Sequence, residues 1–78
     1  NPIVTTTTVA SGHTSISTAM PTGAANGDYV QATVRTKGAN AASIVEAKVT
    51  GGNLVVTVST DPGTGGAVCS VTIWPVPV

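Results

Sequence analysis

The sequence has few of the side chains that carry chemistry. Its 78 residues include three Lys and Arg, three Asp and Glu, one His and one Cys, and the formal net charge is zero. Three dispersed cations form no basic patch for the phosphates of a nucleic acid or for an anionic lipid surface. We therefore expect neither nucleic acid nor membrane among the partners of the chain.

The scarcity of ligating residues has a second consequence. One cysteine cannot form a disulfide within the chain, and a single histidine leaves no ligand set for zinc. We expect no metal and no cofactor. The apolar runs are four residues or shorter, whereas a helix that spans a membrane needs about 20 apolar residues, so we expect no such helix.

What the chain has in quantity is threonine and valine, which together occupy 27 of the 78 positions, as 14 Thr and 13 Val. Branching at Cβ restricts χ1 and favours the pleated, extended backbone. Hydrophobic residues make up 41% of the chain without any net charge, and disordered chains show the opposite combination. The composition therefore predicts an ordered, all-β protein.

The expected core is thin, because the chain has no Phe, one Trp and one Tyr. A chain of this length usually needs disulfides, a metal or oligomerisation in addition to its core. With the first two excluded, oligomerisation is the remaining means of stabilisation, and near-zero charge also favours association. We expect a homotrimer or another homo-oligomer.

Extended segments alternate with clusters of Gly, Pro, Asn and Asp, which form turns. No segment shows the periodicity of a helix. The pattern predicts a small antiparallel β-sandwich or barrel, jelly-roll-like, with five to six short strands. Strands are expected at residues 3–10, 13–18, 29–36, 43–50, 54–59 and 68–74.

The chain is expected to form one domain over residues 1–78. Residues 1–11 would be an N-terminal edge strand or arm, and residues 75–78 an extended tail, because alternate prolines remove ladder donors. The glycine-rich segment 60–67 is expected to form an exposed and unusually flexible loop. Asn1 is too large to be exposed efficiently by removal of an initiator Met, which indicates a processed terminus or part of a longer chain.

The alternation along residues 43–50 assigns the two faces of this expected strand. In residues 43–50 the pattern places Val45 inward and Glu46 outward, so Ile44 would share the outward side with Glu46 and contact another subunit. The spacer between this strand and the next contains Gly51 and Gly52, which is a strong signal for a β-hairpin. Charges at Glu46 and Lys48 would form a solvated pair.

The chain offers little that resembles an active site. His13 could be combined with Asp28 or Asp61 and one of six serines, but no nucleophile-elbow motif surrounds any serine. Asp28 and Asp61 stand in turn sequences, where a carboxylate usually accepts hydrogen bonds from nearby backbone amides. We expect no catalytic residues, and we expect Cys69 to be a buried small hydrophobic residue.

Exposed aromatic and apolar residues are the remaining candidates for recognition. Trp is enriched where subunits meet, and an aromatic face also binds the apolar face of a sugar. The candidate interface residues are Ile3, Val4, Val9, Ile44, Trp74 and Val76. The candidate surface-binding loop residues are Asn26, Tyr29, Asp61 and Thr64.

Two stretches of the second half resemble a known group of proteins. GDYVQATVRT (residues 27–36) and SIVEAKVTGGNLVVTVSTDPGTGGAVCSVTIWPV (residues 43–76) are similar to small β-sandwich modules in virion proteins of tailed bacteriophages. In those modules a GDYV strand precedes a hairpin that ends in a DPG turn, and a final Val-rich strand follows. The similarity covers about two thirds of the chain.

The resemblance implies a structural or adhesive role on a capsid or tail, commonly as a trimer, and it carries over no catalytic residue. We expect a non-enzymatic virion structural protein, a small capsid-associated decoration or cement protein. Its partners would be copies of itself and the major capsid protein or another virion protein. The alternative is a carbohydrate- or surface-binding β-module, either a tail-fibre domain on the virion or a secreted, extracellular adhesin domain.

Overall fold

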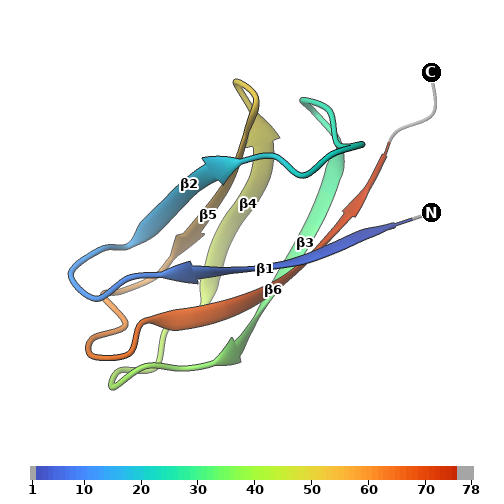
Figure 1. Cartoon of the computed structure of the whole chain (residues 1–78). Coiled ribbons are helices and arrows are strands. Elements are labelled where there is room, and N and C mark those ends of the chain that lie inside the picture. The colour runs from blue at the N-terminus through green and yellow to red at the C-terminus, as the bar shows by residue number, and fades with distance from the viewer. Residues whose placement is uncertain (1, 76–78) are drawn as a thin grey trace.

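The computed structural model describes residues 2–75, which form six β-strands and no helix (Figure 1). Among these residues there is accordingly no helix capable of crossing a membrane. All six expected strands are present, with boundaries within two residues of the predicted ones. The strands are β1 (Ile3–Val9), β2 (Ser15–Ala19), β3 (Tyr29–Thr36), β4 (Ile44–Thr50), β5 (Asn53–Val58) and β6 (Ala67–Trp74).

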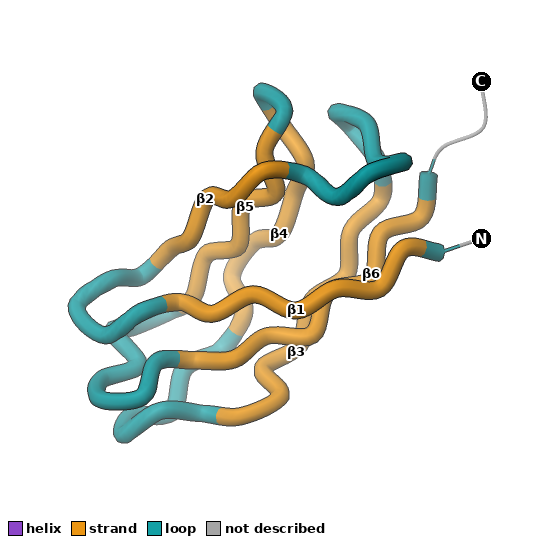
Figure 2. The backbone as a smooth tube through the Cα atoms, in the orientation of Figure 1, coloured by secondary structure: helices purple, strands orange, loops and turns teal. Residues whose placement is uncertain are grey.

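The strands form two antiparallel sheets of three strands each. In sheet A the order is β1-β6-β3, and in sheet B it is β2-β5-β4. Only β4 and β5 are neighbours both in the chain and in a sheet, because every other connection crosses from one sheet to the other (Figure 2). The prediction of a small antiparallel β-sandwich is confirmed.

The core lies between the two sheets and consists of aliphatic side chains and Cys69. Leu54 and Val56 of β5 face Val71 and Ile73 of β6 in the larger of two buried clusters. Both central strands show the alternation that the sequence predicts, since every second residue is buried. A smaller cluster forms at the other end of the sandwich from Val9, Val58 and Ala67.

The predicted hairpin between β4 and β5 is confirmed. Thr50 pairs with Asn53, and the two residues between them, Gly51 and Gly52, have φ angles of 58° and 80°. A two-residue turn with positive φ at both positions is a type I′ turn, whose twist matches that of the strands it joins. Glycine is favoured here because a Cβ strains this backbone conformation.

The predicted faces of β4 are wrong at its first two residues. Ile44 is half-buried and packs against both core clusters, whereas the side chain of Val45 is 64% exposed. The ladder explains this inversion: Ile44 pairs with Val58 and Glu46 with the adjacent Thr57, so the register shifts by a β-bulge. One extra residue in a strand reverses its alternation at that point.

The segment between β5 and β6 is more closely held than its glycine content predicts. Asn40 donates its backbone N–H to the carbonyl oxygen of Pro62 at 2.8 Å, and Ala39 donates to that of Thr64 at 3.0 Å. Pro62 itself is fully buried. The loop is exposed at Asp61, Thr64 and Gly65, as expected, and these hydrogen bonds anchor it on the connection between β3 and β4.

Candidate binding surfaces

The outer face of sheet A carries mainly polar side chains and ends in two aromatic rings. The pairings across β1, β6 and β3 define rows that run perpendicular to the strands. Thr8, Val68 and Thr36 form one row, Thr6, Ser70 and Thr33 the next, and Val4, Thr72 and Gln31 the third. The fourth row contains Trp74 of β6 and Tyr29 of β3.

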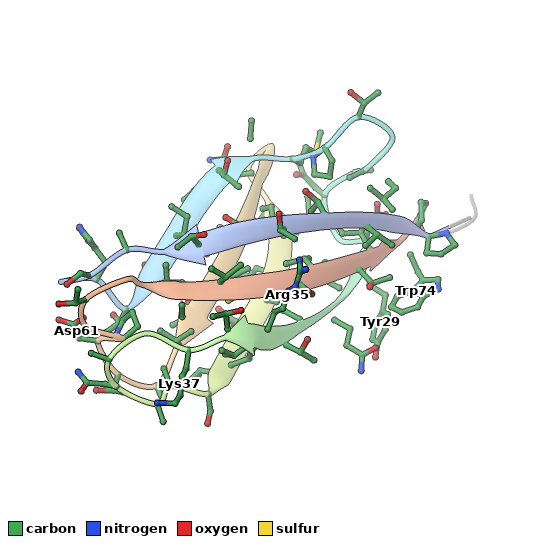
Figure 3. All side chains as sticks on the ribbon, turned by 60° about the horizontal axis from the view of Figure 1, so that its bottom comes forward. Tyr29, Arg35, Lys37, Asp61 and Trp74 are labelled. Carbon is green, nitrogen blue, oxygen red and sulfur yellow. The ribbon has the colours of Figure 1, made fainter. Side chains whose placement is uncertain are left out.

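Tyr29 and Trp74 lie side by side although they are far apart in the sequence (Figure 3). Their ring centroids are 5.5 Å apart and the ring planes are tilted by 47°. Both residues are exposed, Tyr29 at 61% and Trp74 at 39%. The antiparallel pairing of β3 with β6 brings this candidate loop residue and this candidate interface residue into one surface.

The polar neighbours of the two rings were not among the predicted site residues. Gln31 follows Tyr29 by two positions on β3, and Thr72 precedes Trp74 by two positions on β6, so each shares the outer face with its ring. This spacing is visible in the sequence. What the sequence could not show is that both strands belong to the same sheet and lie next to each other.

Apart from Asp28, which directly precedes Tyr29, the charged side chains of the described residues lie away from the two rings. Figure 3 shows Arg35 about midway along the molecule, and Lys37 and Asp61 toward the end opposite Tyr29 and Trp74. On sheet B, the Lys48 Nζ is 3.1 Å from the Glu46 Oε1 in an exposed ion pair. That pair confirms the prediction of a solvated charge pair on β4.

The candidate loop residues are divided between the two ends of the sandwich. Asn26 and Tyr29 belong to the end where β3 begins, whereas Asp61 and Thr64 belong to the end where β6 begins. The side chain of Asn26 has a structural contact there, because its Oδ1 accepts a hydrogen bond from the Gly52 N–H at 2.9 Å. The four residues therefore do not form a single binding site.

Asp61 stabilises the loops at its end of the molecule. Its Oδ1 accepts hydrogen bonds from the N–H groups of Gly63 at 2.8 Å and Gly12 at 2.9 Å. These two bonds, with a smaller contribution from the charge of His13, hold the pKa of the Asp61 carboxyl below its usual value of 3.8. The prediction that Asp61 binds nearby backbone is confirmed, and the bond to Gly12 links two loops that are distant in sequence.

The residues considered for catalysis do not converge. His13 and Asp61 share one loop cluster, and both are exposed. Asp28 lies at the other end, where its Oδ2 accepts a hydrogen bond from the Ala25 N–H at 2.8 Å. Within residues 2–75 no three His, Cys, Asp or Glu side chains are placed to hold a metal ion, and the same residues form no pocket.

Cys69 lies in the core, as predicted. Its side chain is fully buried in the larger cluster, and its Sγ is 3.6 Å from the carbonyl oxygen of Ala67. Burial raises the pKa of the thiol, because removing it from water disfavours the charged thiolate.

The candidate interface residues have different environments in the structure. Val4 is 71% exposed on the outer face of sheet A, close to Trp74. Ile3 and Ile44 are half-buried and pack against the core, and Val9 is fully buried within it. Of these five only Val4 and Trp74 present substantial apolar surface, and Val76 lies outside the described residues.

The edge strands of the two sheets also differ in how well they are protected against pairing with another chain. β3 has a register shift between Val34 and Thr36 and carries Arg35, and β4 has a bulge and two charges. β2 has only five residues. β1, by contrast, has seven residues without charge, Gly or Pro, and it pairs with β6 in regular register from Ile3 to Val9.

Comparison with protein-family models, with curated proteins and with solved structures found no match for the chain.

Proposed function

We propose that the protein is a non-enzymatic structural module of a bacteriophage virion, a small capsid-associated decoration protein that binds copies of itself and the capsid surface. The segments that resemble phage virion modules form β3, β4, β5 and β6, four of the six strands. The carboxylates of Asp61, Asp28 and Glu46 have local structural contacts, which suits a structural role.

The observation that carries the proposal is the outer edge of β1. Natural sheets protect their edges with charges, prolines, bulges or short strands, because an unprotected edge pairs readily with another chain. β3, β4 and β2 each have at least one of these features, and β1 has none of them. A strand added to β1 would extend sheet A through backbone hydrogen bonds, as in β-augmentation.

The inner face of β1 supports the same proposal. Ile3 and Val9 reach the core at the two ends of the strand, but the inward positions between them are Thr5 and Thr7, which are half-buried. β1 therefore contributes less apolar burial than a strand with four aliphatic residues on its inner face would. A partner strand on its free edge would stabilise it, in keeping with the small size of the domain.

The test is self-association of the full chain, measured by analytical ultracentrifugation over a dilution series from about 1 to 100 μM, a range set by ordinary assembly affinities. Thr6→Lys puts a charge on the exposed edge of β1 and should weaken self-association at least tenfold. Thr33→Lys is the matched control, since Thr33 is exposed in the same row on the other edge of sheet A.

A monomer at every concentration would overturn the self-assembly part of the proposal. If Thr6→Lys and Thr33→Lys weaken self-association equally, the interface between copies does not lie at the β1 edge. The virion part is tested by mass spectrometry of purified particles of the phage that encodes the chain. Absence of the protein from those particles would overturn it.

A further inference from the structure

The two aromatic side chains of this protein are placed where folding alone does not favour them. The chain has one Tyr, one Trp and no Phe. A buried aromatic residue contributes more apolar area than any other type, and this thin core is made of Val, Leu, Ile, Ala and Cys only. Both rings instead lie outside the core and next to each other.

The rows beside the rings on the outer face of sheet A are polar and uncharged. The one charge next to them in the chain is Asp28, which directly precedes Tyr29 and whose Oδ2 accepts a hydrogen bond from the Ala25 N–H. The next row contains Gln31 and Thr72, with Val4 at its end, and the row after that contains Ser70 between two threonines. Arg35, the first charge along β3, is six positions from Tyr29, or roughly 20 Å along an extended strand. An ionic ligand would find no counter-charge in these rows.

We propose that Tyr29 and Trp74, with Gln31 and Thr72, form a binding platform for a neutral saccharide. The C–H groups on one face of a pyranose ring carry partial positive charge and are attracted to the negative face of an aromatic ring. The hydroxyls at the rim of the sugar would exchange hydrogen bonds with the Gln31 amide and the Thr72 hydroxyl, which both donate and accept.

The geometry favours a saccharide chain over a protein partner. The two rings and Val4 are the exposed large hydrophobic residues on this face, which is few beside the roughly 20–30 residues that each partner contributes to a standard protein interface. This proposal does not depend on the self-association of β1.

The experiment is a titration of the full chain with cellotetraose, maltotetraose, chitotetraose and mannotetraose, followed by ¹H–¹⁵N NMR and Trp74 fluorescence. An open platform with few hydrogen bonds gives weak affinity, so the sugars are taken to about 10 mM. We expect at least one of them to shift the amide signals of Tyr29, Gln31, Thr72 and Trp74, and to leave those of sheet B unchanged.

The variants separate stacking from other effects. Tyr29→Ala should weaken binding at least fivefold, and Tyr29→Phe, which keeps the ring, should stay within twofold of the parent chain. Val45→Ala is the control for loss of an exposed apolar side chain on the other sheet. NMR spectra and unfolding curves establish that each variant is folded, and Gln31→Ala provides a second, independent change on the same surface.

Three results would overturn the saccharide platform. The first is the absence of shifts at this surface with all four sugars, and the second is equal binding by Tyr29→Ala and the parent chain. The third is a Tyr29→Ala variant that no longer self-associates but binds the sugars like the parent chain. That result would show that the rings contact another copy of the protein and not a saccharide. Thr6→Lys, which disrupts the proposed β1 edge, should bind the sugar normally, so the two proposals fail separately.

Discussion

Gly38 lies against the carbonyl oxygen of Pro62 so closely that a Cβ built on Gly38 would be 2.5 Å from it. The carbonyl oxygen of Gly66 would be only 2.8 Å from the same Cβ. Gly38 lies in the loop between β3 and β4, and both oxygens belong to the loop between β5 and β6. Hydrogen bonds from Ala39 and Asn40 hold the two loops together beside Gly38. The two loops can therefore pack this closely only because residue 38 has no side chain.

Gly38→Ala should destabilise the protein by about 2 to 4 kcal/mol, because both obstructing atoms are backbone and the loops must separate. Thermal and urea unfolding measure the effect, and in a domain of this size each kcal/mol moves the melting temperature by about 4–8 °C. Gly12→Ala is the control, since its Cβ would meet open space at a φ of 86° and should cost about 1–2 kcal/mol. Equal losses would contradict the packing explanation.

The β-bulge at the start of β4 is tested by a pair of neighbouring substitutions. Ile44→Ala should lower the free energy of unfolding by about 1–3 kcal/mol, because Ile44 packs against both core clusters. Val45→Ala should change it by about 0.5 kcal/mol, since its side chain points to solvent. Simple alternation along the strand predicts the reverse order, and that order in urea titrations would rule out the bulge.

The low pKa of Asp61 makes the loop cluster sensitive to acid. A carboxyl whose pKa is lower in the folded chain than in the unfolded chain stabilises the fold above its unfolded pKa, near 3.8. This contribution is lost as the pH falls through the folded pKa. Asp61→Asn cannot titrate, so its stability should fall less than that of the parent chain between about pH 5 and pH 2.

The comparison is made by measuring melting temperatures of both chains across that range. The difference between them should be largest near neutral pH and should shrink in acid, since the parent chain then loses its advantage. Parallel curves would show that the hydrogen bonds from Gly12 and Gly63 do not favour the charged carboxylate.

Cys69 should react with thiol reagents only when the sandwich opens. The thiol is fully buried and its pKa is raised, so both access and thiolate formation are suppressed in the native state. Labelling by a disulfide reagent at pH 8 should be at least 100-fold slower than in denaturing urea. Labelling of the folded chain at the rate of the denatured chain would place Cys69 at the surface.

The local elements of this protein could be read from its sequence. Period-2 alternation of Val with Thr and other polar residues identified the strands, since a pleated backbone turns successive side chains to opposite faces. Paired glycines identified the hairpin, because residues 51 and 52 need positive φ. The burial of Cys69 also followed from alternation, as it shares a face with Val71 and Ile73.

Only the tertiary structure decided which strands became neighbours, and with them the candidate sites. The pairing of β3 with β6 places Tyr29 beside Trp74, and the pairing of β1 with β6 leaves the other edge of β1 free. The bulge that exposes Val45 depends on the register with β5. Strand formation follows from local conformational preference, whereas partner, register and loop contacts follow from the simultaneous packing of both sheets, which no local pattern encodes.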